Sequence, residues 1–166
     1  MNLFEQHGAR FSECRQYRYG LWRIWGEGPC ATFVMLNPST ADEQTNDPTV
    51  ERCERRARAL GLDGVRVANI FALRSTDPQA LYGHPDPVGP LNDEAILDAV
   101  RDAGIVICAW GGHGTLNGRG EAVVRLLHQH GMDLHYLALN ADGTPKHPLY
   151  IGYDRQPTPW KDLPKT

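Results

Sequence analysis

Four short apolar runs along the chain alternate with longer segments whose apolar residues recur at helical spacing. The runs are rich in Val, Ile, Leu, Phe and Tyr, which is typical of strands covered on both faces of a sheet. A polar loop and a helical segment separate each run from the next, so the strand–helix–strand pattern repeats three times. This repeat predicts parallel strands joined by right-handed crossovers. The runs are Ala31–Leu36, Val65–Ile70, Ile105–Trp110 and Leu134–Leu139.

The helical segments carry start and stop signals of the usual kinds. An N-cap residue followed by proline opens the first helix, and a glycine follows the last apolar position of each helix. An asparagine with two acidic residues opens the second. The expected helices begin at Asp47–Pro48, at Asn92 and at about Gly120, and they end at Gly61, Gly104 and Gly131.

An additional strand is expected near the N-terminus. Residues of Tyr17–Trp25 alternate in character, and the turn signal Gly26–Pro29 separates them from the first apolar run. This pattern predicts an antiparallel hairpin over about residues 15–36. The proline-rich tail from about residue 153 to 166 is expected to be irregular, with Trp160 packed back on the body or left free. The predicted fold is a single α/β domain over residues 1–166, with a three-layer, four-stranded parallel sheet flanked by helices and an N-terminal antiparallel hairpin strand.

Composition narrows the class of protein. The chain has 166 residues, of which 41% are hydrophobic and 22% charged, as in ordinary globular domains. Its formal charge of −3 provides no global attraction to nucleic acid, so binding of that kind would need a local basic face. No apolar stretch is long enough for a spanning helix, and residues 1–10 lack the apolar region of a signal peptide. We therefore expect a cytoplasmic monomer that does not bind membranes.

The four cysteines are scattered along the chain. Their spacing favours free thiols in a cytosolic protein over a zinc or iron–sulfur site, which stays the minority interpretation. No metal ligands and no cofactor are expected. The cysteines are Cys14, Cys30, Cys53 and Cys108.

Most amide and imidazole side chains of the chain follow the four predicted strands. In open parallel sheets, ligands bind outside the carboxyl ends of the strands. The sequence therefore predicts a ligand site built from the four loops that leave this edge. These loops are Asn37–Asp42, Asn69–Asp77, Gly111–Arg119 and Asn140–Tyr150.

Short motifs in these loops resemble those of the uracil-DNA glycosylase superfamily. They are Leu36–Ser39 for the first motif, Val67–Asn69 for the second strand, Trp110–Gly111 for the third strand, and His147–Pro148 for the second motif. Their order and spacing agree with that fold from about Ala31 to Tyr150. The chain resembles an uncharacterised bacterial family still more closely. The matching segments are Leu36–Asp42, Asp47–Thr49, Asp86–Pro90, Ala109–Gly111 and His147–Tyr150.

The resemblance implies a nucleobase-recognising protein that hydrolyses an N-glycosidic bond of a flipped base in DNA, or of a nucleoside or nucleotide. Asn69 would pair with the base edge, and His147 would donate to the departing base. Asn37 would orient a water, Phe71 would provide a stacking face, and Leu149 or Tyr150 would fill the vacated stack. The same loops add Pro38, Ser39, Gly111 and His113 to the expected binding residues.

The sequence departs from the superfamily pattern at three places. Ser39 stands where that family has Gly or Tyr, and Leu149 stands where Ser is usual. Asn37 replaces the activating carboxylate of the most efficient branch, and an amide is no base. Asp42 or Asp47 could supply a carboxylate instead. The alternative is a non-catalytic module that binds a nucleotide or modified base in the same pocket, and the net acidity favours a small ligand or a single strand over a duplex.

Plainer interpretations stay open for each motif. Asn37–Pro38 could be a strand-ending turn, Asn69 part of an internal hydrogen-bond network, and His147–Pro148 a plain loop. The glycine-rich loop 111–120 precedes a helix, so it could hold a phosphate, but it matches no phosphate-binding fingerprint and a tight turn is favoured. Trp110 is expected in the core. The arginines of the first helix favour a solvated face over a phosphate-binding one, and a Ser/His/Asp hydrolase is disfavoured because no nucleophile elbow is present.

Overall fold

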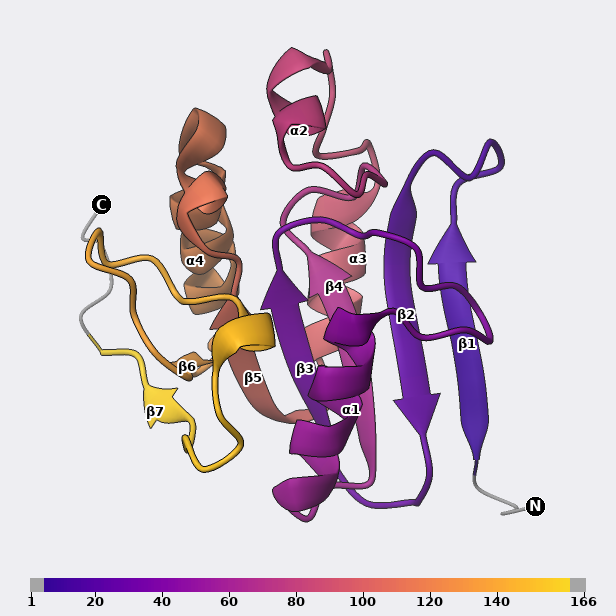
Figure 1. The fold of residues 1–166 in the computed structure, drawn as a ribbon, viewed down its shortest axis with the longest axis vertical. Coiled ribbons are helices and arrows are strands. Elements are labelled where there is room, and N and C mark those ends of the chain that lie inside the picture. The colour runs from indigo at the N-terminus through magenta and orange to yellow at the C-terminus, as the bar shows by residue number, and fades with distance from the viewer. Residues whose placement is uncertain (1–4, 162–166) are drawn as a thin grey trace.

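A seven-stranded mixed sheet runs through residues 5–161, the part of the chain that the computed structural model describes (Figure 1). The strand order is β1-β2-β4-β3-β5-β6-β7. Strands β3, β4, β5 and β6 pair in parallel, which confirms the predicted four-stranded parallel unit. Its fourth strand is much shorter than predicted. The bounds are β1 Gln6–Phe11, β2 Arg18–Ile24, β3 Cys30–Met35, β4 Gly64–Asn69, β5 Ala103–Ala109, β6 His135–Tyr136 and β7 Thr158–Pro159.

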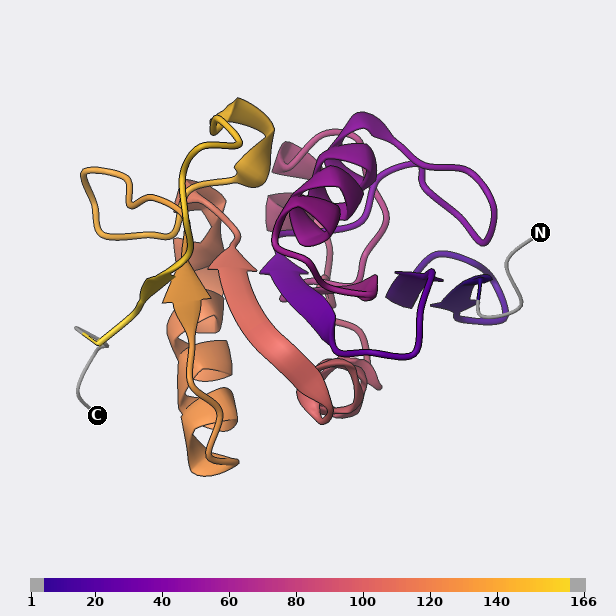
Figure 2. The ribbon, with the colours of Figure 1, turned by 90° about the horizontal axis from the view of Figure 1, so that it is seen from below.

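Helices cover both faces of the sheet, which gives the three expected layers (Figures 1 and 2). Helix α1 packs on one face, where Val50 and Cys53 join Phe33 and Val67 in one buried cluster. Helices α3 and α4 lie on the opposite face and contribute to a second buried cluster. The α-helices are α1 Pro48–Ala59, α2 Gln79–Gly83, α3 Asn92–Val100 and α4 Arg119–Gln129, and the 3₁₀ helices are η1 Gly112–Gly118 and η2 Pro148–Tyr150.

The predicted ends of α1 are confirmed. Asp47 caps the helix, since its Oδ1 accepts a hydrogen bond from the backbone N–H of Val50 at 2.9 Å. Its Oδ2 accepts from the N–H of Ala41 at 3.3 Å, which also fixes the loop before the helix. Gly61 follows the helix with φ of +76°, the left-handed conformation that glycine adopts most easily.

The prediction that Gly104 ends the second helix is wrong. Helix α3 ends at Val100, and Gly104 lies within β5. A Cβ at Gly104 would come within 2.8 Å of Pro29, so the glycine allows close approach between neighbouring chain segments. Asn92 is the first residue of α3, and its side chain donates to the backbone oxygens of Asn69 and Ile70.

The predicted hairpin over residues 15–36 is also wrong in its pairing. Strand β2 does form, but it pairs antiparallel with β1 and β4 and not with β3. Both edges of β3 are taken by the parallel strands β4 and β5, so no edge is left for β2. Three of the six residues of β1 are exposed and three are polar or charged, so a search for apolar runs does not find this strand.

The C-terminal segment returns to the body of the domain. Strand β7 pairs with β6, and Trp160 is 9% exposed, with its ring centroid 5.8 Å from that of Trp110. The interpretation in which Trp160 packs on the core is therefore confirmed. Residues 162–166 of the predicted irregular tail lie outside the described residues.

Candidate functional site

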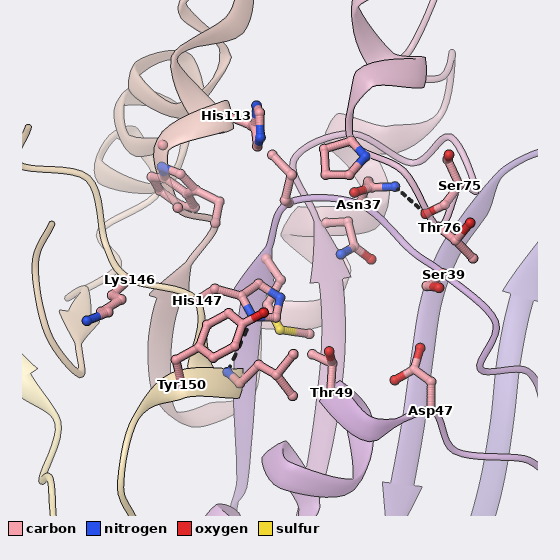
Figure 3. A pocket seen from close by; sticks show the side chains of 18 of the residues that line it. Asn37, Ser39, Asp47, Thr49, Ser75, Thr76, His113, Lys146, His147 and Tyr150 are labelled. Atoms are coloured by element: carbon pink, nitrogen blue, oxygen red, sulfur yellow. Dashed lines mark hydrogen bonds between the residues drawn. The ribbon is translucent and has the colours of Figure 1, made fainter.

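A cavity of about 560 Å³ opens at the carboxyl edge of β3, β4 and β5 (Figure 3). It is lined by residues from all four predicted loops, so one site gathers side chains that are far apart in the sequence. Asn37, Asn69 and His147 all line it. Five other predicted residues line it too, namely Ser39, Gly111, His113, Leu149 and Tyr150.

Asn37 joins the loop after β3 to the loop after β4. Its Nδ2 donates to the backbone oxygen of Ser75 at 3.0 Å, with longer contacts to the oxygens of Leu73 and Pro38. Figure 3 shows the amide nitrogen directed toward Ser75 and the oxygen directed to the opposite side. The half-buried amide therefore has a structural role, and its Oδ1 is the atom that can accept a hydrogen bond in the cavity.

Asn69 ends β4 with its side chain only 2% exposed. Its Oδ1 accepts a hydrogen bond from Nη2 of Arg18 at 3.3 Å, whereas its buried Nδ2 has no partner among the described residues. A buried donor without a partner costs about 1–3 kcal/mol. The internal network expected as one interpretation thus exists for the oxygen, and the nitrogen stays outside it.

Arg18 is a site residue that the sequence did not indicate. The guanidinium is buried at the start of β2, lines the cavity, and donates through Nη1 to the backbone oxygen of Ala41 at 3.1 Å. Burial lowers its pKa to about 10, so it stays charged at neutral pH. The available signal was a charged residue inside an otherwise aromatic strand segment between Tyr17 and Tyr19, which is unusual for a strand covered on both faces.

His147 lies just before η2, which begins at Pro148. Its Nδ1 accepts a hydrogen bond from the backbone N–H of Leu149 at 3.3 Å. Burial lowers the pKa of the imidazole, and the negative charge of Asp47 opposes that shift in part. Since Nδ1 is an acceptor, the neutral ring carries its proton on Nε2, which is then a hydrogen-bond donor.

Two of the predicted binding residues do not line the cavity. Phe71 is 0% exposed and belongs to the hydrophobic core, so its assignment as a stacking face is wrong. Pro38 is buried as well, and its backbone oxygen accepts from Asn37 and from the N–H of Ser75. Pro38 is not among the lining residues, so its part in binding stays a prediction.

The rim of the cavity carries exposed aromatic side chains. Tyr150 is 78% exposed, and Figure 3 shows it projecting from the same turn as His147. His113, another lining residue, is in contact with exposed Tyr82 of α2, whose hydroxyl lies 2.9 Å from its Nδ1. Lys146 also contributes to the lining, but its ammonium group points away from His147 (Figure 3).

Arginines of α1 hold the segment that carries His147. The buried Arg56 donates to the backbone oxygens of Ile151, Gly152 and Arg155, and Arg52 donates to those of Pro148 and Ile151. The expectation of a solvated face is wrong for these two side chains. It is right for Arg55 and Arg58, which are exposed and pair with glutamates one turn earlier.

The glycine-rich loop after β5 serves the packing of Trp110. A Cβ on Gly114 would lie 2.1 Å from the indole ring, and one on Gly120 would lie 2.8 Å from it. The loop forms η1 and leads into α4, with left-handed conformations at Gly111 and Gly118. These observations support the tight turn over a phosphate cradle. Trp110 lies in the core, as expected, while its edge reaches the cavity.

We also looked in the site for a free carboxylate, a serine–histidine pair and a group of metal ligands. Both carboxylate oxygens of Asp47 accept backbone N–H groups, and no hydrogen bond joins Ser39 to a histidine in residues 5–161. All four cysteines are free thiols. Within the described range, no group of three or more His, Cys, Asp or Glu could hold a metal ion, and no helix is long and apolar enough to cross a membrane.

Comparisons with known proteins give one match. The family model described as "Protein of unknown function (DUF1643)" matches residues 18–149, which are 132 of the 166 residues. The matched part begins at Arg18 and ends at Leu149, so it contains almost all the residues that line the cavity. Neither a curated protein nor a solved structure matches the chain.

Proposed function

The chain belongs to this family, and from that premise we propose that its cavity binds a nucleobase and that the protein hydrolyses the N-glycosidic bond of the bound base. The observation that carries the proposal is the shared cavity of Asn37, Asn69 and His147, each of which comes from a motif that resembles the uracil-DNA glycosylase superfamily. The volume of about 560 Å³ is within the range of small-molecule sites.

Asn69 is the residue that reads the base in this proposal. Its unpartnered Nδ2 can donate to a ring carbonyl such as O4 of uracil. Its Oδ1 has a second lone pair besides the one used by Arg18, so it can also accept from the neighbouring ring N–H. Such a pair of hydrogen bonds satisfies a buried amide that otherwise costs free energy.

His147 and Asn37 take part in the cleavage. The bond between C1′ and the base nitrogen breaks with its electron pair on the base, and the Nε2–H of neutral His147 donates to the base oxygen where negative charge develops. One such donor contributes about 3–4 kcal/mol to transition-state stabilisation. A water held by Oδ1 of Asn37 adds to C1′ and releases a proton to solvent.

A second candidate function is binding without cleavage. It is favoured because the side chains that could activate a water already make structural hydrogen bonds. Both oxygens of Asp47 accept backbone N–H groups at the start of α1, and the nitrogen of Asn37 donates from one loop to the next. Neither group is free to deprotonate a water. In this case the same cavity holds a nucleotide or a modified base as a ligand.

The first experiment is a cleavage assay on uracil-containing oligonucleotides, single-stranded and double-stranded, followed by alkali to reveal abasic sites. We expect cleavage that His147→Ala and Asn37→Ala each reduce by about a hundredfold or more. His128→Ala is the matched control, since His128 is an exposed imidazole on α4 and does not line the cavity. Equal cleavage by all variants would contradict the assigned roles.

The second experiment separates binding from cleavage. Nucleosides and free bases are added to the intact protein, and the melting temperature is measured. A ligand that raises it in the wild type but not in Asn69→Leu, without any cleavage, supports the binding module. If no oligonucleotide is bound or cut, and no base or nucleoside changes the melting temperature, both candidates are wrong.

A further inference from the structure

The contact between Arg18 and Asn69 determines which atom of the amide is left without a partner among the described residues. The Oδ1 and Nδ2 atoms of an asparagine can exchange places by rotation about one bond, and the two orientations present opposite hydrogen-bonding character. A guanidinium has only donors, so the atom that faces it must be the oxygen. The nitrogen then has no partner among the described residues, in a side chain that lines the cavity.

Building on the proposed function, we propose that Arg18 is a positioning residue that locks the Asn69 amide with its donor toward the ligand, and that the cavity therefore selects oxo bases over amino bases. Oxo bases such as uracil and hypoxanthine present a carbonyl next to a ring N–H. Amino bases such as cytosine and adenine present an NH₂ group at the same place, where it would face the NH₂ of Asn69.

The neighbours of Asn69 hold its amide in this orientation. The backbone at this point is fixed, because Asn92 donates to the oxygens of Asn69 and Ile70 at 2.8 and 3.1 Å, and Arg119 donates to the latter at 2.7 Å. Arg18 is itself held by Ala41. With a pKa of about 10 the guanidinium stays charged at neutral pH and cannot become an acceptor. A turned amide would place NH₂ against N–H donors.

His147 supplies a second donor to the cavity. Nε2 of neutral His147 is a donor, because its Nδ1 is occupied by the N–H of Leu149. Donors from Asn69 and His147 therefore line one cavity. The O2 atom of uracil and that of cytosine can both accept from His147, so this donor favours pyrimidines in general. The choice between oxo and amino bases therefore rests on Asn69.

The test compares two matched ligand pairs, uridine with cytidine and inosine with adenosine, by titration of the intact protein. Binding constants are obtained by calorimetry, and hydrolysis rates replace them for any nucleoside that is cut. We expect the wild type to favour the oxo member of each pair about tenfold or more, which corresponds to at least about 1.4 kcal/mol. A preference below twofold in both pairs would overturn the inference.

Variants of Arg18 test the positioning role. In Arg18→Met the amide is free to turn, so the ratio between oxo and amino ligands should fall toward one. In Arg18→Lys an ammonium donor is retained, so most of the wild-type preference for the oxo ligand should be kept. Arg23→Met is the matched control, since Arg23 is an equally buried arginine of the same strand that neither lines the cavity nor contacts Asn69. A variant that is only less stable should bind both ligands of a pair more weakly and leave the ratio of their binding constants unchanged.

The outcomes separate this inference from the proposed function. If bases bind and Arg18→Met keeps the wild-type ratio, the positioning role is wrong and the proposed function stands. If no base or nucleoside binds to the wild type, the proposed function is wrong and the inference is overturned with it. Should Arg18→Met fail to fold, the ratios of the wild type and of Arg18→Lys decide.

Discussion

The imidazole Nδ1 of His147 accepts a hydrogen bond from the backbone N–H of Leu149, 3.3 Å away. This contact closes the first turn of η2 and fixes both the tautomer and the direction of the ring. It requires an unprotonated Nδ1, so protonation of the ring removes it. The first turn of η2 and the position of the proton on Nε2 thus both depend on an unprotonated Nδ1.

The protein should therefore become less stable as the pH is lowered, and His147 should cause part of this loss. Burial places the pKa of this imidazole in the folded state below its value in the unfolded chain. As the pH falls below about 6.5, the unfolded chain takes up the proton first, and folding becomes less favourable. Thermal unfolding at pH 7.5 and 5.5 measures this loss.

The variant His147→Asn isolates the effect, because an amide oxygen can still accept from the N–H of Leu149 but does not titrate. All carboxylates are the same in the two proteins, so their contribution cancels. We expect a smaller decrease of the melting temperature in the variant than in the wild type. Equal decreases would show that His147 does not take part in the acid transition.

Arg56 should be far more important for stability than its neighbour Arg55. Arg56 is 2% exposed and donates to the backbone oxygens of residues 151, 152 and 155, whereas Arg55 is exposed and only pairs with Glu51. We expect Arg56→Met to cost about 2–4 kcal/mol of unfolding free energy in urea titrations. Arg55→Met is the control and should cost less than about 0.5 kcal/mol. Similar values for both would contradict the role of Arg56.

A methyl group at Gly114 should disturb the packing of Trp110. The added carbon would lie 2.1 Å from the indole ring, so ring or backbone must shift. We expect Gly114→Ala to cost about 1–3 kcal/mol and to change the near-ultraviolet circular dichroism. Gly112→Ala in the same loop is the control, since its nearest atom lies at 3.6 Å from the added carbon. The prediction fails if both variants keep the wild-type spectrum and stability.

Replacing Asn37 by aspartate should make stability depend on pH in the opposite sense to His147. One carboxyl oxygen would face the backbone oxygens that now accept from Nδ2, among them that of Ser75. This raises the pKa of the new carboxyl group in the folded state, so stability is lost as the pH rises through that value. We expect Asn37→Asp to be about 1–3 kcal/mol less stable than the wild type at pH 7.

At pH 4 the protonated carboxyl group can donate to Ser75, so the difference from the wild type should shrink. Urea titrations at both pH values measure it. Asn37→Ala is the comparison, because it loses the hydrogen bonds without gaining a charge and its deficit should vary little with pH. A constant deficit in Asn37→Asp would show that the amide does not bridge the two loops as described.

Part of the site was predictable because parallel strands place their carboxyl ends along one edge. The apolar runs that became β3, β4 and β5 put Asn37, Asn69 and the loop after Trp110 at that edge. The stretch that includes β6 brought His147 to the same cavity, although the regular strand covers only two residues. Phe71 was misjudged because an apolar residue after a strand has the same pattern whether it faces the core or a ligand.

Pairing between strands was not predictable in the same way. The turn signal Gly26–Pro29 fits a hairpin, but the hydrogen bonds of an edge can be taken by any strand that reaches it. Strand β4 takes that edge of β3, and β2 pairs with β4 on its other side. Similarly, the two pairs of arginines in α1 cannot be told apart in sequence, and only the position of residues 148–155 separates the buried from the exposed ones.

By itself the sequence determined the α/β class, the parallel strands, the caps of α1 and the edge of the sheet at which the polar loops meet. These features follow from local periodicity and from rules that hold for every parallel sheet. Only the tertiary structure decided which atom of Asn69 is hydrogen-bonded and which is left without a partner in residues 5–161, because that choice depends on Arg18, a residue of a strand that the pattern of parallel runs does not include. Hydrogen-bond direction is set by partners across space, and the order of residues along the chain does not record it.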